Sequence, residues 1–197
     1  MRGARTSRVE INYGPKGSGK SWDAKRRVEK SPRRIAIWDP KFEWVGEKDS
    51  PRVGSTTVNN LREFADATIE NGGRIDRVLV FNLGPELFDN WAKWVQDEGD
   101  QLVVIDEAPL VLNRDRMNPV RLALATTTRH SRIDLLLCAQ RPARLAPDVR
   151  SQADEVRAWR MIERLDLKAL EGSYGSQFAD RVKLLRGHDF TTWRPGR

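Results

Sequence analysis

The chain has 197 residues, a length that favours one domain, and 39% of them are hydrophobic, enough to form a core. A mean hydropathy of −0.64 and the lack of any apolar run near about 18 residues exclude a membrane-spanning helix. The single cysteine, Cys138, excludes an internal disulfide and a cysteine-based zinc site, and two histidines leave little material for a transition-metal site. The basic N-terminus has no apolar stretch behind it and is not a secretory signal. We expect a soluble cytoplasmic protein.

Charge is distributed unevenly along the sequence. Residues 1–34 carry a net charge of +8 and residues 113–160 carry +5, whereas residues 35–112 carry −8. All ten cations of 113–160 are arginines. This segregation favours a polyanionic partner that is bound by particular loops.

The hydrophobic pattern alternates between strands and helices. Val9, Ile11 and Tyr13 alternate with polar residues, which predicts a strand at 8–13, and a glycine-rich segment follows. Continuing along the chain, we predict helix 20–30, strand 34–39, helix 59–70, strand 78–81, helix 86–97, strand 102–105, helix 119–130, strand 133–139, strand 156–159, helices 163–171 and 176–185, and strand 189–193.

Several of these strands are continuously apolar, which indicates a parallel sheet covered by helices on both faces. The expected fold class is therefore α/β, with a single doubly wound, mainly parallel sheet. We expect one domain at 8–193, between a flexible basic N-terminus at 1–7 and a tail at 194–197.

A phosphate-binding loop is the strongest motif in the sequence. Its residues match the pattern G-x-x-x-x-G-K-[ST] and lie between a predicted strand and a predicted helix; they are Gly14, Pro15, Lys16, Gly17, Ser18, Gly19, Lys20 and Ser21. In such a loop, backbone N–H groups surround the β-phosphate of a nucleotide. Lys20 is expected to reach the β- and γ-phosphates, and Ser21 to ligate Mg²⁺. The motif predicts a site for a nucleoside triphosphate, and we expect ATP with Mg²⁺.

Two more candidate groups follow apolar strands. Asp106 and Glu107 end the strand at 102–105, where Asp106 can hold the metal ion and Glu107 can polarise a water for attack on the γ-phosphate. Gln140 ends the strand at 133–139, the end at which α/β sheets bind ligands, and can contact the γ-phosphate or the attacking water. Cys138 is expected to be a buried small residue and not a nucleophile.

Three segments resemble the FtsK–HerA superfamily of DNA-pumping ATPases. They are Ile-Trp-Asp-Pro-Lys-Phe-Glu-Trp at 37–44, Val-Ile-Asp-Glu-Ala at 104–108 and Arg-His-Ser-Arg-Ile-Asp-Leu-Leu-Leu-Cys-Ala-Gln-Arg-Pro at 129–142. The resemblance covers about 9–193 and is greatest to the small genome-packaging ATPases of tailless, membrane-containing double-jelly-roll viruses. Phe42 departs from the superfamily, which often has glycine at this position, so no role is transferred to the neighbouring Asp39 and Glu43.

The resemblance implies a RecA/FtsK-like core in which ATP hydrolysis drives double-stranded DNA into a preformed capsid. It also implies a homo-oligomeric ring, expected to be hexameric, with a capsid or membrane vertex protein as partner, in the host cytoplasm or attached to the virion. Each site would be completed by an arginine of a neighbouring subunit. Arg129 is the first candidate because it matches a superfamily arginine by position, and Arg150 is the second. We expect both near the end of the strand that carries Gln140, where Arg141 can instead brace its own loop.

The DNA contact of such a motor is expected to be made to phosphates and to be independent of sequence. Arg114 and Arg116, in the segment after the Asp-Glu strand, are the candidates for this contact.

Other nucleotide-binding classes fit less well. The sequence has no N-K-x-D guanine motif of GTPases and no L-S-G-G-Q motif of ABC ATPases before the Asp-Glu strand. Two alternatives remain. One is a morphogenesis or DNA-export ATPase of the filamentous-phage type, related to zonula occludens toxin, although those proteins usually carry a membrane segment. The other is a nucleotide-gated assembly protein with little turnover.

Overall fold

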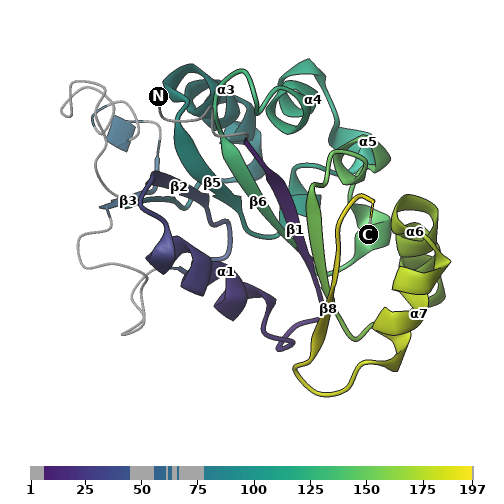
Figure 1. Ribbon diagram of the computed structural model, residues 1–197. Helices are drawn as coiled ribbons and strands as arrows, with labels where there is room; N and C mark the ends of the chain where they lie inside the picture. Colours follow the sequence, from purple (N-terminus) through teal and green to yellow (C-terminus); the bar gives the residue numbers. More distant parts are fainter. Residues whose placement is uncertain (1–6, 45–55, 61, 64–65, 67–77, 197) are drawn as a thin grey trace, which may run out of the picture.

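One sheet with helices on both faces forms the body of the protein (Figure 1). A computed structural model describes residues 7–44, 56–60, 62–63, 66 and 78–196. The strands are β1 (Val9–Tyr13), β2 (Arg34–Trp38), β3 (Thr56–Val58), β4 (Val78–Phe81), β5 (Gln101–Ile105), β6 (Asp134–Ala139), β7 (Glu155–Trp159) and β8 (Phe190–Trp193). Their order is β3-β4-β2-β5-β6-β1-β7-β8, and of these strand pairs only β7–β8 is antiparallel. The α/β class and the mainly parallel sheet are confirmed.

The described helices are α1 (Lys20–Lys30), α3 (Phe88–Glu98), α4 (Pro119–Thr126), α5 (Pro147–Arg150), α6 (Arg164–Tyr174) and α7 (Ser176–Leu184). Among them, none is long and apolar enough to cross a membrane. The predicted helix at 59–70 falls largely outside the described residues.

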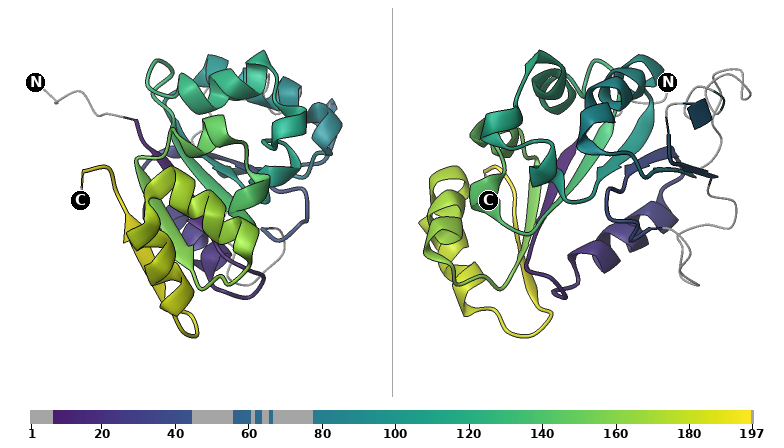
Figure 2. Two further views of the ribbon diagram at one scale, coloured as in Figure 1. Left: turned by 90° about the vertical axis from the view of Figure 1, so that its right-hand side faces the viewer. Right: turned by 180° about the vertical axis from the view of Figure 1, so that it is seen from behind.

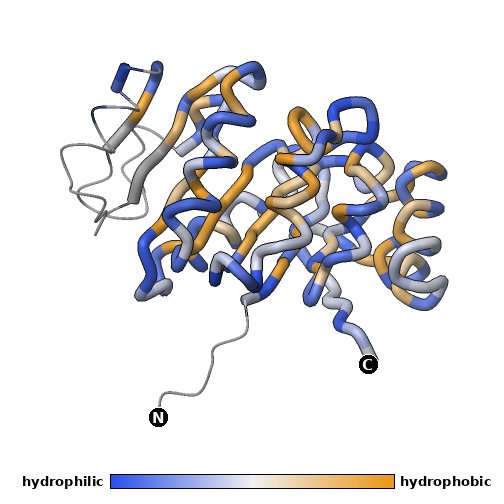
Figure 3. Tube along the Cα trace, turned by 90° about the horizontal axis from the view of Figure 1, so that it is seen from above, coloured by the Kyte–Doolittle hydropathy of each residue, from blue (hydrophilic) through white to orange (hydrophobic). Residues whose placement is uncertain are grey.

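The two faces of the sheet are covered unequally (Figure 2). Ala24 and Val28 of α1 pack on side chains from one face of the central strands, namely Ile35, Ile37, Val104, Leu136 and Cys138. The alternate residues of the same strands point to the opposite face and pack on α3 to α7. Hydrophobic residues lie along the central strands, and hydrophobic and hydrophilic residues alternate along the helices (Figure 3). Because both faces are buried, the strands need the continuous apolar runs seen in the sequence.

Aromatic rings fill the space between the sheet and α3. Trp91 of α3 is fully buried, with its ring centroid 5.2 Å from that of Trp38 and 5.4 Å from that of Phe88. Trp94 packs on Phe81 with centroids 5.3 Å apart. Aromatic pairs at these separations add to the free energy gained from burial alone. The two tryptophans therefore belong to the core, as their helical spacing predicts.

Three details of the prediction were wrong. The helix at 119–130 ends at Thr126, after which the chain makes tight turns into β6. Strand β3 and the single-turn helix α5 were not predicted. Elements of three or four residues are too short to show a period of hydrophobic residues.

A buried ion cluster joins β1, α1, β7 and the chain after β8. The Glu155 carboxylate, 3% exposed, lies 3.2 Å from a guanidinium nitrogen of Arg8, 3.1 Å from those of Arg27 and Arg157, and 2.8 Å from that of Arg194. Burial alone raises the pKa of Glu155, but the arginines outweigh it and hold the pKa below its usual value. The carboxylate thus stabilises the fold only while it is ionised.

We expect Glu155→Gln to lower the free energy of unfolding by about 1.5–3 kcal/mol at pH 7, because it weakens the charge-assisted hydrogen bonds that the buried carboxylate accepts from partly exposed arginines. The folded-state pKa of Glu155 is below the unfolded value of 4.5, so this stabilisation is present above pH 4.5 and is lost as the pH falls through the folded-state pKa. Urea denaturation of both proteins from pH 3 to pH 7 measures the difference. Glu171→Gln, at an exposed site on α6, is the control and should change stability by under about 0.5 kcal/mol.

Candidate nucleotide site

The carboxyl ends of β1, β6 and β5 bring three predicted groups to one edge of the sheet, where the chain turns from β1 into α1 (Figure 1). Tyr13 of β1 pairs with Ala139 of β6, and Leu137 of β6 pairs with Ile105 of β5. The phosphate loop, Gln140 and Asp106 follow directly after these ends. Since neighbouring strands are about 4.8 Å apart, the loop and Asp106 are separated by about 10 Å, which leaves room for a phosphate chain.

The phosphate loop has the local structure that an anion site needs. Gly19 has φ 106°, a conformation that favours glycine, and α1 begins at the next residue, so its N-terminal N–H groups face the loop. A Cβ atom on Gly14 would lie 2.4 Å from Ser18 Oγ. That Ser18 hydroxyl is buried, and it has no hydrogen-bond partner among the described residues. A phosphate oxygen in the loop could accept a hydrogen bond from it. Lys20 is only 6% exposed.

Asp106 is held in a buried position by two donors. Trp44 Nε1 donates to Oδ2 at 2.9 Å, and the backbone N–H of Glu107 donates to Oδ1 at 3.0 Å. Burial raises the pKa of Asp106 to about 6, although the Trp44 hydrogen bond and the Lys20 ammonium act in the opposite direction. Ionisation of Asp106 therefore costs free energy unless a further positive charge is bound beside it.

The Glu107 carboxylate contacts two polar side chains, those of Gln140 and Lys41. Gln140 Nε2 donates to this carboxylate, and Lys41 Nζ lies 2.8 Å from the same oxygen. Glu107 also has φ 50°, a left-handed conformation that turns the chain sharply after β5. The structure thus brings Asp106, Glu107 and Gln140 together, as the sequence predicts, and adds Lys41.

Lys41 and Trp44 reach the site through a turn that follows β2. The Asp39 carboxylate is fully buried and accepts hydrogen bonds from the backbone N–H groups of Glu43 at 3.1 Å and Trp44 at 2.8 Å. Phe42 has φ 59°, in the region where glycine is favoured. The glycine that the FtsK–HerA superfamily often has at this position fits the same turn. Asp39 therefore organises the turn, a role that the sequence did not predict.

The donor atoms at this edge fit Mg²⁺. The Ser21 hydroxyl and the Asp106 carboxylate are oxygen ligands, and Mg²⁺ in nucleotide sites needs one or two of these beside phosphate oxygens and water. The described part of the chain contains no cluster of three or more His, Cys, Asp or Glu side chains able to hold a metal without a nucleotide.

The candidate arginines lie in three different places. Arg150 donates to the carbonyl oxygens of Pro142 at 2.8 Å and Leu145 at 3.1 Å, so it braces the turn after Gln140. Arg141 is also used locally, since its Nε donates to Asp166 at 2.9 Å.

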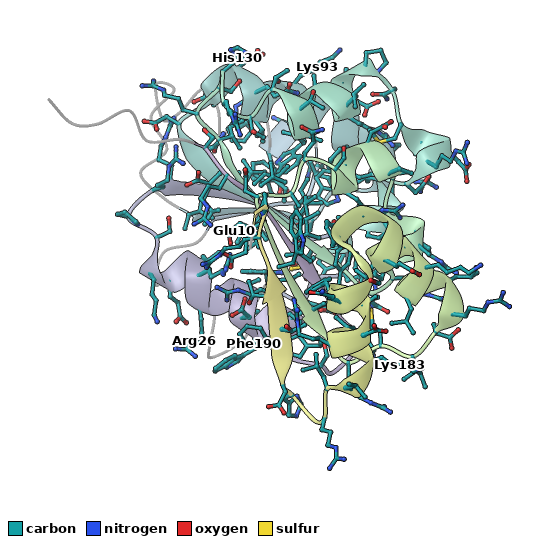
Figure 4. All side chains as sticks on the ribbon, turned by 45° about the vertical axis from the view of Figure 1, so that its right-hand side comes forward. Glu10, Arg26, Lys93, His130, Lys183 and Phe190 are labelled. Carbon is teal, nitrogen blue, oxygen red and sulfur yellow. The ribbon has the colours of Figure 1, made fainter. Side chains whose placement is uncertain are left out.

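Arg129 does not lie at the end of the Gln140 strand, and this expectation was wrong. The residue precedes β6, so it lies at the amino edge of the sheet, where it is 75% exposed and 3.7 Å from Asp154. Its neighbour His130 accordingly lies at the opposite end of the molecule from Phe190, which pairs with the carboxyl end of β7 (Figure 4).

Arg114 and Arg116 are exposed on a turn next to the site. They line a cleft of about 580 Å³ together with Glu107, Gln140 and Arg144. Arg116 Nη1 donates to the carbonyl oxygen of Leu110 at 3.0 Å, which fixes the turn. The cleft therefore joins the nucleotide site to an arginine-rich surface.

We expect Asp106→Asn to stabilise the nucleotide-free protein while abolishing hydrolysis, because a neutral amide avoids the cost of burying the charge. The folded-state pKa of about 6 lies above the ordinary 3.8, so wild type loses stability as the pH rises from about 4 to 6. The free energy of unfolding of the variant should begin to exceed that of wild type over this pH range, and the difference should reach about 1–3 kcal/mol at higher pH. Urea denaturation checks this, with the exposed Asp180→Asn as control. A variant that is less stable than wild type at pH 8 would contradict the expectation.

Comparisons with known proteins agree on the fold. The genome packaging NTPase B204 from Sulfolobus turreted icosahedral virus 2, in complex with AMPPCP, matches with a TM-score of 0.78 and 20% identity over 95% of this chain and 92% of that chain. VirB4 of Thermoanaerobacter pseudethanolicus matches with a TM-score of 0.66 and 13% identity over 100% and 89%. The N-terminal domain of zonular occludens toxin from Neisseria meningitidis matches with a TM-score of 0.50 and 17% identity over 78% of this chain and 76% of that chain.

The sequence itself shows the family. The model of zonular occludens toxin (Zot) matches residues 8–178, and no curated protein sequence matches the chain. This family is one of the two alternatives that the sequence leaves open, and the packaging ATPase B204 shares the fold. Together with the phosphate loop, Asp106, Glu107 and the parallel sheet, these matches show that the chain is a P-loop ATPase of the zonular occludens toxin family.

Proposed function

We propose that the protein is an ATP-driven translocase of the FtsK–HerA type that moves a viral genome into a preformed capsid. The observation that carries the proposal is a nucleotide site with a positioned glutamate, within a fold that matches the packaging NTPase B204 over nearly the whole of both chains. A motor needs hydrolysis, and Glu107 offers the base for it. This argues against a protein that only binds nucleotide.

Each polar group of the site has a role in this reaction. Lys20 binds the β- and γ-phosphates, and Ser21 and Asp106 hold Mg²⁺, which would neutralise charge on the phosphates. The Glu107 carboxylate orients a water and accepts its proton. Gln140 touches Glu107 already, so its amide can detect whether the γ-phosphate is present.

A ring of subunits, hexameric by the resemblance, would complete each site with an arginine from a neighbouring subunit. Arg141 and Arg150 are committed to hydrogen bonds within the subunit, whereas Arg129 is exposed on the opposite edge of the sheet. From there Arg129 can reach only the site of a neighbour. An arginine supplied in this way is worth about 10³–10⁵ in rate for phosphoryl transfer. Arg129 therefore remains the candidate that acts between subunits.

The arginine-lined cleft is our candidate for the DNA contact. Arg114 and Arg116 are exposed, and their turn shares a cleft with Glu107 and Gln140. Hydrolysis could thus change the position of side chains that hold DNA phosphates. Contacts to phosphates carry no sequence information, which suits a motor that must move any sequence.

The second candidate function is the export of DNA during assembly of a filamentous phage. The match to the zonular occludens toxin model over residues 8–178 favours it. The two functions differ in the DNA that is moved, since filamentous phages export a single strand and the packaging ATPases of the resemblance move a duplex. Both would use the same nucleotide site.

We expect Lys20→Ala to lose nucleotide binding and Glu107→Gln to bind ATP without hydrolysing it, because binding does not need the base. Binding is measured with a radiolabelled nucleotide, and turnover by phosphate release with Mg²⁺. The wild-type rate should increase with duplex DNA for packaging and with circular single-stranded DNA for export. Turnover of Glu107→Gln near the wild-type rate would remove that residue from the role, and no response to either DNA would contradict both functions.

The double variant Arg114→Ala/Arg116→Ala should bind duplex DNA more weakly and with a smaller dependence on salt. Each phosphate contact that is lost lowers the slope of log affinity against log salt by about 0.9, so a change of about 1.8 is expected. Lys183→Ala/Arg186→Ala removes the same charge from an exposed place at the end of α7 and serves as control (Figure 4). An unchanged slope in the first variant, or an equal change in the control, would exclude the cleft as the DNA contact.

A further inference from the structure

An aromatic pocket borders the phosphate loop on the side away from Glu107. It has a volume of about 380 Å³, within the range of small-ligand sites. Its lining comes from the end of the loop, the first turn of α1, the end of β7 and the chain around the start of β8; the residues are Ser18, Gly19, Trp22, Asp23, Trp159, His188 and Phe190.

The direction that a triphosphate would take in the loop favours this pocket as the place for the base. Lys20, Asp106, Glu107 and Gln140 mark the γ-phosphate end of the site. A second pocket beside the loop, of about 360 Å³, contains Gln140 and belongs to that end. The aromatic pocket contains none of these four residues and begins where the loop enters α1. The nucleoside must leave the loop at this end.

The aromatic side chains of the pocket are arranged for stacking. Trp22 is 63% exposed and Phe190 is 45% exposed, high values for such large apolar side chains. The Arg26 guanidinium lies 4.6 Å from the centroid of the Trp22 ring, which holds the indole in place. Phe190 packs on Trp159 with ring centroids 5.1 Å apart. Figure 4 shows Phe190 and Arg26 on the same side of the molecule. Both rings line the pocket, so a planar base bound in it can contact them.

Few polar side chains of the pocket are available to read the edge of a base. The Asp23 carboxylate binds Arg157 at 2.7 Å and accepts from Asn12 Nδ2 at 3.1 Å. His188 Nδ1 lies 3.2 Å from the carbonyl oxygen of Ser18, so only its second ring nitrogen is left. Strong discrimination between ligands needs buried polar groups that the wrong ligand leaves unpaired. Stacking alone accepts any base, since every base has a π-face.

We propose that Trp22 and Phe190 bind the base of the nucleotide by stacking and with little discrimination between bases, so that GTP and CTP are also bound. This inference rests on the proposed function, since it assumes a nucleoside triphosphate in the phosphate loop.

Calorimetry with Mg²⁺ and either ATP or inorganic triphosphate, which has no base, tests the proposal. Trp22→Ala and Phe190→Ala should each weaken ATP binding by about 5- to 150-fold, the usual effect of removing one stacking partner. Triphosphate binding should not change, and Trp22→Phe should keep most of the ATP affinity. Leu184→Ala, which removes a 77% exposed side chain outside the pocket, is the control and should behave as wild type. Wild type should bind ATP, GTP and CTP within about tenfold of one another.

The outcomes distinguish a failure of the stacking proposal from a failure of the nucleotide site that the proposed function requires. Unchanged ATP binding in both alanine variants overturns the stacking assignment, and so does an equal loss of triphosphate binding, which would mean that the loop itself is altered. If wild type binds ATP more than about tenfold more tightly than GTP or CTP, the proposal that the pocket discriminates little between bases is wrong. If wild type binds triphosphate no better than Lys20→Ala, the nucleotide site of the proposed function fails instead.

Discussion

The hydrogen-bonded register of three parallel strands determines where every polar group of the site lies. β6 runs between β1 and β5, so Gln140 emerges between the phosphate loop and Asp106. A shift of one residue in either pairing would turn alternate side chains to the wrong face and break the contacts of α1 or of α3 to α7 with the sheet. The same apolar packing that stabilises the core therefore aligns the site.

The site contains features that cost stability, and the surrounding contacts hold them in place. Asp106 is a buried carboxyl group with a raised pKa, and Glu107 and Phe42 both have left-handed backbones, a conformation that costs about 1 kcal/mol or more for each residue. Trp44, fully buried, joins the β2 turn to Asp106 through its indole nitrogen. The cost is concentrated at the carboxyl edge, where the metal ion of a bound nucleotide would supply the missing positive charge.

The sequence predicts the central strands and the polar groups that follow them, because continuous apolar runs and the phosphate-loop pattern are local signals. It does not show Lys41 beside Glu107, since that contact depends on a turn whose left-handed residue is a phenylalanine. Arg129 was misplaced for a different reason: it precedes β6 in the sequence, so it lies at the opposite edge of the sheet from residues such as Gln140 that follow the strand. The aromatic pocket joins Trp22 to Phe190, 168 positions later in the sequence, and no local pattern connects such residues.

The position of β1 in the sheet has a consequence during synthesis of the chain. Its first residue, Val9, pairs with Leu135 of β6, and its other partner strand is β7. At about 5–20 residues per second, a ribosome makes the phosphate loop several seconds or more before either partner exists. Strands β2, β4 and β5 pair only with one another, with β3 and with β6, so that half of the sheet can assemble first. The nucleotide site consequently cannot form until β6 has been made, and β1, although it is made before the other described strands, is among the last of them to acquire its partners.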